Sequence, residues 1–294
     1  MKLRFILLLC LFFKFQLTAQ PVYEFLDLQM HPTMHVPYSF FGDGFQYFDE
    51  GDEPKLTYKH QFKNVNFANY WQNNKGARII VSGALTRENV RSAEKARAVI
   101  MEQIEYVNNF AKENSDHFAV AKSPQEVRHL LATTEKTIII HAIEGARNLV
   151  NSQEDAHFWA KQGIAFITLI HLVDSELGSS AIRPGLATTI INWKGAIRSR
   201  EKRGGLTEKG KNVIRWLANA GIMTDITHMS DQCREDAITF SEENNIPVIA
   251  THDVFRPIQN HPRGIAPQQI LRIYKNGGFI SLPISGASLK PMHR

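Results

Sequence analysis

The segment Thr137–Glu144 (TIIIHAIE) is apolar over most of its length and ends on a carboxylate. A strand that is buried on both faces of a parallel sheet shows this nearly continuous apolar pattern. Similar short segments recur along the chain, and amphipathic helical stretches separate most of them. The segments expected to be strands are Phe25–His31, Ala77–Ala84, Thr137–Glu144, Ala165–His171, Ile222–His228, Pro247–Asp253 and Gly278–Ile284.

Helical periodicity and start signals mark the segments between these strands. The expected helices are Arg87–Asn114, one that begins at Ser123-Pro124, Thr207–Ala220, Asp231–Glu243 and Pro267–Lys275. Repeated strand–helix units predict an α/β fold with a parallel sheet and right-handed crossovers. A TIM-type (β/α)8 barrel fits best, with its eighth unit lacking or truncated, because the sequence stops soon after the seventh strand. A doubly wound open sheet is the alternative, but Met30–Thr33 is no glycine-rich phosphate loop.

The first 19 residues have the layout of a secretory signal peptide. Lys2 and Arg4 form a basic head, Ile6–Phe13 is an apolar run, and Leu17–Ala19 offers a cleavage site. The run is shorter than the roughly 20 residues of a membrane-spanning helix, so no stable membrane span is expected. We therefore expect residues 20–294 to form the mature protein, secreted or periplasmic.

The charge balance excludes one class of partner. The net charge is +5, and three of the 34 basic residues lie in the first 19 positions. The remaining basic residues nearly balance the 29 acidic ones. Nucleic-acid binding needs a clustered basic surface, so none is expected.

Metal-capable side chains fall where the expected strands end. They are His31, Glu144, His171, His228 and His252. All strands of a parallel barrel end on one face, so these side chains should converge although they lie far apart in sequence. Imidazoles with one carboxylate suit zinc or a similar transition ion. Asp225, on the same strand as His228, is interpreted as buried support for the ligands.

Several segments resemble the membrane dipeptidase (renal dipeptidase) family of the metal-dependent amidohydrolase superfamily. Each motif is weak alone, but together they follow the family order and cover most of the chain. They are Ile143–Gly145, Thr168–His171, Gly205–Gly210, Asp225–Ser230, Pro247–His252, His261–Gly264 and Asn276–Gly278.

The resemblance implies two zinc ions bridged by Glu144 and a metal-bound hydroxide that hydrolyses the amide bond of dipeptides. It implies that His228 and His252 bind the second ion and that His31 with Gln29 binds the first. His171 would then contact the substrate carbonyl, and Arg263 would hold the substrate carboxylate. The catalytic set is therefore Glu144, His171 and Arg263, within a hydrolase barrel spanning residues 20–294.

Two features depart from the family pattern. In Asp27–Pro32, Gln29 replaces the first histidine of the family motif, and an amide oxygen is a weaker, neutral ligand, so the first metal position is expected to be weakened. The family also has an acidic residue on an eighth strand, which nothing after Ile284 supplies.

The main hypothesis is a secreted zinc dipeptidase, with a homodimer as a candidate assembly. The alternatives are a catalytically impaired dipeptidase-like binding protein and an amidohydrolase for another ester- or lactone-type substrate.

Overall fold

The computed structural model describes residues 25–31, 77–86, 92–181 and 204–282. Several expected features fall wholly or partly outside these ranges. They include the signal peptide at 1–19, the start of the helix expected at Arg87–Asn114 and the end of the strand expected at Gly278–Ile284. The segments Val36–Asn74 and Leu172–Gly205, which the sequence predicts to be long loops, also lie wholly and mostly outside these ranges, respectively.

Strand β4 (Thr137–Glu144) is central to a parallel sheet of seven strands, ordered β1-β2-β4-β5-β6-β7, with β3 also paired to β4. The other strands are β1 (Phe25–Met30), β2 (Ala77–Leu85), β3 (Phe118–Ala121), β5 (Ile164–Thr168), β6 (Met223–Asp225) and β7 (Val248–Ile249). β3 pairs with the first half of β4 and β5 with its second half, while β2 runs along the opposite edge.

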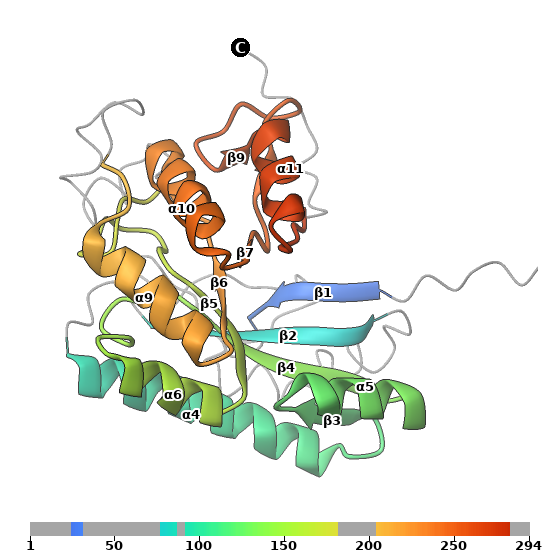
Figure 1. The fold of residues 1–294 in the computed structure, drawn as a ribbon. Coiled ribbons are helices and arrows are strands. Elements are labelled where there is room, and N and C mark those ends of the chain that lie inside the picture. Colours follow the sequence, from blue (N-terminus) through green and yellow to red (C-terminus); the bar gives the residue numbers. More distant parts are fainter. Residues whose placement is uncertain (1–24, 32–76, 87–91, 182–203, 283–294) are drawn as a thin grey trace, which may run out of the picture.

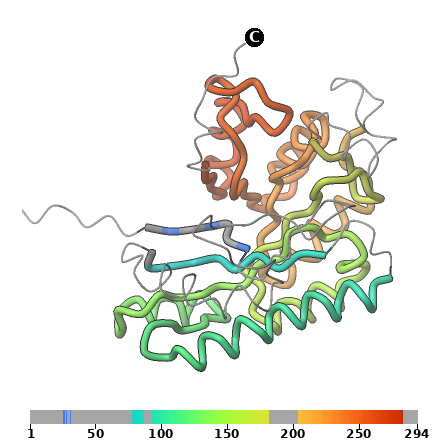
Figure 2. Tube along the Cα trace, turned by 180° about the vertical axis from the view of Figure 1, so that it is seen from behind, coloured from blue at the N-terminus to red at the C-terminus, as the bar shows by residue number. Residues whose placement is uncertain are grey.

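Helices alternate with these strands and cover the sheet. Figure 1 shows α4, α5 and α6 beneath β2 and β4, and α10 and α11 beside β7. Figure 2 shows the same arrangement from behind, with the chain progressing around the sheet in sequence order. Their bounds are α4 (Ala93–Glu113), α5 (Pro124–Thr133), α6 (Gln153–Lys161), α9 (Glu208–Asn219), α10 (Asp231–Asn244) and α11 (Pro267–Lys275), with a small two-stranded sheet of β8 (Val254–Phe255) and β9 (Gly264–Ile265) before α11.

The two faces of β4 have different neighbours. Ile139 and Ile143 pack into the clusters formed with the helices, whereas Ala142 packs against Val81 and other apolar side chains of neighbouring strands. Successive side chains of a strand point to opposite faces. Glu144 therefore shares the face of Ala142, away from the helices, at the carboxyl end of the strand.

The predicted α/β class and parallel sheet are confirmed, and the strands follow the arrangement of a TIM-type barrel. Among the described residues the barrel is not closed, since β1 and β7 are not paired. No described helix is long and apolar enough to cross a bilayer.

Several expected elements need correction. Strands β5, β6 and β7 each end earlier than expected, because the chain leaves the sheet before it reaches the histidines. The strand expected at Gly278–Ile284 is wrong over its described part, where Ile280 forms a single parallel bridge to Ala250. Sequence analysis also missed β3 and α6, which are only 4 and 9 residues long.

A buried histidine on β4 gives a prediction for stability. His141 is 1% exposed, and its Nε2 lies 2.9 Å from Asn108 Oδ1 on α4. Burial, assisted by the charge of Lys122, lowers the pKa of His141 to about 4. The folded protein therefore binds fewer protons than the unfolded chain between that value and the ordinary pKa of 6.5.

We predict that protonation of His141 in the unfolded chain lowers the free energy of unfolding by up to about 3 kcal/mol as the pH drops from about 6.5 to about 4. Above pH 6.5, His141 is neutral in both the folded and the unfolded chain, so its titration takes nothing from the free energy of unfolding there. Urea titrations across this range should show a flatter pH slope for His141→Gln than for the wild type. Replacing the exposed His129 by Gln is the matched control and should keep the wild-type slope; equal slopes for all three proteins would contradict the prediction.

Candidate metal centre

The candidate ligands lie at the carboxyl ends of the strands or in the loops that follow them. Glu144 is the last residue of β4, and His31 follows β1 directly. Three histidines lie three residues beyond the ends of β5, β6 and β7; in that order they are His171, His228 and His252. The sequence analysis had placed these three histidines at the ends of strands, whereas they lie in the loops that follow; their expected convergence is confirmed.

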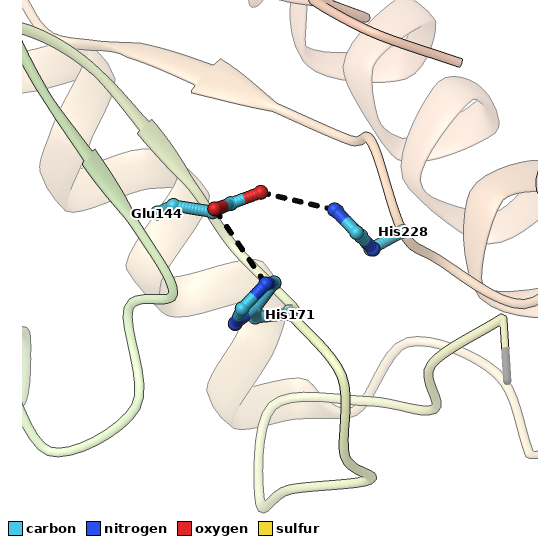
Figure 3. Close-up of side chains that lie close together, drawn as sticks. All are labelled: Glu144, His171 and His228. Atoms are coloured by element: carbon cyan, nitrogen blue, oxygen red, sulfur yellow. Dashed lines mark hydrogen bonds and ion pairs between the residues drawn. The ribbon is translucent and has the colours of Figure 1, made fainter. Parts of the chain in front are cut away.

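The carboxylate of Glu144 lies among four imidazoles. Its Oε2 is 3.1 Å from Nε2 of His31 and 3.5 Å from Nε2 of His171. Its Oε1 is 3.0 Å from Nε2 of His228 and 3.1 Å from Nε2 of His252. Figure 3 shows Glu144 between His171 and His228, with one carboxylate oxygen directed to each. One ligand atom from each of these three residues lies within 4.8 Å of the others.

The site keeps Glu144 ionised. The side chain is buried, which alone would raise its pKa, but His171 and His31 and the hydrogen bonds from His228 and His252 lower that pKa well below its usual value. Burial and the charge of Arg263 lower the pKa of His228 well below its usual value. For His31, the effect of burial is outweighed by Glu144, which raises its pKa.

The donor set fits a transition-metal ion. His31 Nδ1 lies 2.9 Å from the Gly83 carbonyl oxygen, which can only accept, so Nδ1 carries a proton and donates it. When His31 is neutral, its lone pair is therefore on Nε2, the ring nitrogen that lies beside Glu144. The Nε2 atoms of His228 and His252 also lie 3.0 Å apart, and both lie within 3.1 Å of Glu144 Oε1. A cation among these atoms would satisfy the lone pairs and the carboxylate together.

Two further residues were predicted for the site, Gln29 and Arg263. Gln29 belongs to β1, but its side chain is outside the described part of the structure. Arg263 donates from Nη2 to the backbone oxygen of His252 at 2.7 Å, and its Nε lies 3.8 Å from Oδ1 of Asp253. Arg263 is therefore anchored next to a candidate ligand rather than touching Glu144.

Sequence analysis missed two groups around the centre. Arg234 and Asp253 form a fully buried ion pair, with 3.2 Å between Nη2 and Oδ2. Thr227 and Thr251 each precede a candidate ligand and bond to buried Asp225. The repeated Thr-His dipeptide at two strand ends was an available signal for the threonines. The Arg234–Asp253 pair had no comparable signal, because Arg234 lies within α10 and no motif links it to Asp253.

The chain is similar to known dipeptidases in sequence and in fold. Dipeptidase verJ of Clonostachys rogersoniana is 26% identical over 190 residues, which are 64% of this chain and 44% of that protein. The probable dipeptidase PvdM from Pseudomonas aeruginosa has a similar structure, with a TM-score of 0.64, 18% identity, and coverage of 92% of this chain and 63% of that one.

A metallo peptidase from Rhodobacter sphaeroides, solved with a phosphinate mimic of the dipeptide L-Ala-D-Ala, has a TM-score of 0.61 and 17% identity over 78% of this chain and 72% of that one. The chain thus spans less than half of the length of the curated relative and under two thirds of PvdM.

The family model described as membrane dipeptidase (peptidase family M19) matches residues 55–294, which include four of the five residues that converge at the centre. The fold, the clustered histidines around Glu144 and this match agree, and the chain belongs to the membrane dipeptidase family.

Proposed function

We propose that this protein is an exported, zinc-dependent dipeptidase that hydrolyses the amide bond of dipeptides. The observation that carries the proposal is the ionised Glu144 carboxylate within 3.0–3.5 Å of four imidazole nitrogens, in a chain of the membrane dipeptidase family. Export is proposed from the signal-peptide pattern of residues 1–19.

Each residue of the cluster has a role in this proposal. Glu144, His228 and His252 would hold one zinc ion, and Glu144 with His31 and Gln29 would hold a second, more weakly bound one. Bound zinc supplies a Lewis acid for the substrate carbonyl and lowers the pKa of a coordinated water to about 7. Burial of the cluster excludes bulk water, which strengthens every charge interaction within it.

His171 and Arg263 orient the substrate. His171 stands beside Glu144, from where it can donate a hydrogen bond to the carbonyl oxygen of the scissile amide. The Arg263 guanidinium pairs with the substrate carboxylate, since its planar geometry matches two carboxylate oxygens. The solved relative with a phosphinate mimic of L-Ala-D-Ala makes D-configured second residues a first choice for a substrate panel.

Removal of a central ligand tests the enzyme hypothesis. We predict that His228→Ala binds less zinc than the wild type and loses dipeptide turnover by at least about a hundredfold, because a ligand shared between metal and Glu144 is gone. Elemental analysis and a hydrolysis assay on L-Ala-L-Ala and L-Ala-D-Ala measure both effects. His129→Ala, at an exposed position on α5, is the control and should behave like the wild type.

The wild type should hold two zinc ions per chain. A wild-type protein that binds zinc, turns over no dipeptide and hydrolyses lactones or esters instead would support the alternative amidohydrolase. A protein that binds zinc but hydrolyses none of these substrates would favour the binding-protein alternative.

The carboxylate clamp gives a second prediction. We expect Arg263→Lys to raise KM for dipeptides about ten- to hundredfold, because it keeps the charge but loses the bidentate geometry. Dipeptide amides, which lack the carboxylate, should be affected far less. Zinc content must be measured in parallel, since Arg263 also bonds the backbone of His252. Equal losses for dipeptides and their amides, at unchanged zinc content, would show that Arg263 does not bind the carboxylate.

A further inference from the structure

Three threonines converge on one fully buried carboxylate behind the candidate metal centre. Asp225 is the last residue of β6, and its Oδ2 accepts from the hydroxyls of Thr168 and Thr251, each at 2.7 Å. Its Oδ1 accepts from the hydroxyl of Thr227 at 2.6 Å and from the amides of Thr227 and Thr251 at 3.0 and 3.1 Å. Five donors therefore meet the lone pairs of one carboxylate, which compensates for its burial.

These bonds tie together the ends of three adjacent strands. Thr168 ends β5, Asp225 ends β6, and Thr251 stands two residues beyond β7. Thr227 and Thr251 are also joined directly, since the amide of Thr251 donates to the Thr227 hydroxyl at 2.9 Å. Thr227 precedes His228 and Thr251 precedes His252, so the backbone that carries each imidazole is fixed at the preceding residue.

The network also fixes which ring nitrogen of His252 faces Thr251. Thr251 gives its single hydroxyl proton to Asp225, so its oxygen can only accept from His252 Nδ1, 2.8 Å away. His252 Nδ1 is therefore the donor in this bond, which leaves Nε2, the ring nitrogen near Glu144 and His228, as the atom that a metal could bind. A histidine that binds a metal through Nε2 needs this tautomer.

Buried threonine hydroxyls do not all join this network. Thr224, next to Asp225 on β6, is also buried, and its hydroxyl has no hydrogen-bond partner among the described residues. The bonds to Asp225 are thus a property of specific positions rather than of buried threonines in this sheet.

We infer that Asp225 is a positioning residue that holds His228 and His252 as one preorganised pair of metal ligands, through Thr227 and Thr251. The inference rests on the proposed metal-dependent function and deepens it. It assigns the three residues no contact with substrate and no part in proton transfer to it. Their effect is on the geometry and the tautomer that a metal ion meets.

The test compares isosteric variants in the full protein. Thr227→Val and Thr251→Val remove a hydroxyl and keep the shape, whereas Thr227→Ser and Thr251→Ser keep the hydroxyl. Zinc affinity is measured by competition with a chromophoric chelator, and the stability of metal-free protein by urea unfolding. We expect each Val variant to bind zinc about ten- to hundredfold more weakly, and each Ser variant to bind it nearly as the wild type does.

Thr224→Val is the matched control, because it removes a buried hydroxyl outside the network; its zinc affinity should equal that of the wild type. The double variant Thr227→Val/Thr251→Val should lose less affinity than the product of the single losses, since both threonines act through Asp225. Nitrogen-15 NMR of the metal-free protein should show the Nδ1-protonated tautomer of His252 in the wild type and a mixture in Thr251→Val.

Unchanged zinc affinity in both Val variants would overturn the inference, as would equal losses in Thr224→Val. Lower urea stability without a change in zinc affinity would show that the network serves only folding. Zinc affinity and dipeptide turnover are separate readouts. A wild type that binds zinc and hydrolyses no dipeptide contradicts the proposed function alone, whereas Val variants with wild-type zinc affinity in an active dipeptidase contradict this inference alone.

Discussion

The carboxylate of Glu144 is the constraint on which the rest of this structure depends. It is a charge placed at the end of a buried strand, where ionisation is unfavourable unless positive or hydrogen-bonding groups surround it. Four imidazoles from four other strand ends supply this environment. Those side chains meet only if β1, β4, β5, β6 and β7 run in the same direction and end at the same edge, so the parallel sheet and the site require each other.

Two titratable residues of β4 show how local surroundings decide chemistry. His141 faces α4 and meets an amide, and burial keeps it neutral. Glu144, three residues further, faces the other side and meets imidazoles, which keep it charged. Both are buried and both lie on one strand. The alternation of side chains along the strand places one in the packing between sheet and helices and the other in the candidate site.

Much of this arrangement can be predicted from the sequence. Apolar segments such as Thr137–Glu144 mark buried parallel strands, and the placement of His and Glu at their ends predicts that these residues converge. The short elements β3 and α6 escape prediction, because periodicity over so few residues carries little signal. Strand ends are equally hard to predict, since the apolar pattern continues into the loops that carry His171, His228 and His252. The contacts of Arg263 depend on loop geometry that pattern alone does not specify.

The backbone of His228 has one further consequence. This residue adopts a left-handed conformation with φ of 68°, which is unfavourable for a histidine and persists only where neighbours hold it. The neighbours are Ala181, whose amide donates to the His228 oxygen at 2.5 Å, and Ser179, whose oxygen accepts from the Ser230 amide at 2.9 Å. The imidazole is thus held from one side by β6 and from the other by the loop after β5. Loss of these two bonds would let the strained His228 backbone relax to an ordinary conformation, so the position of this candidate ligand depends on Ser179 and Ala181 as well as on β6.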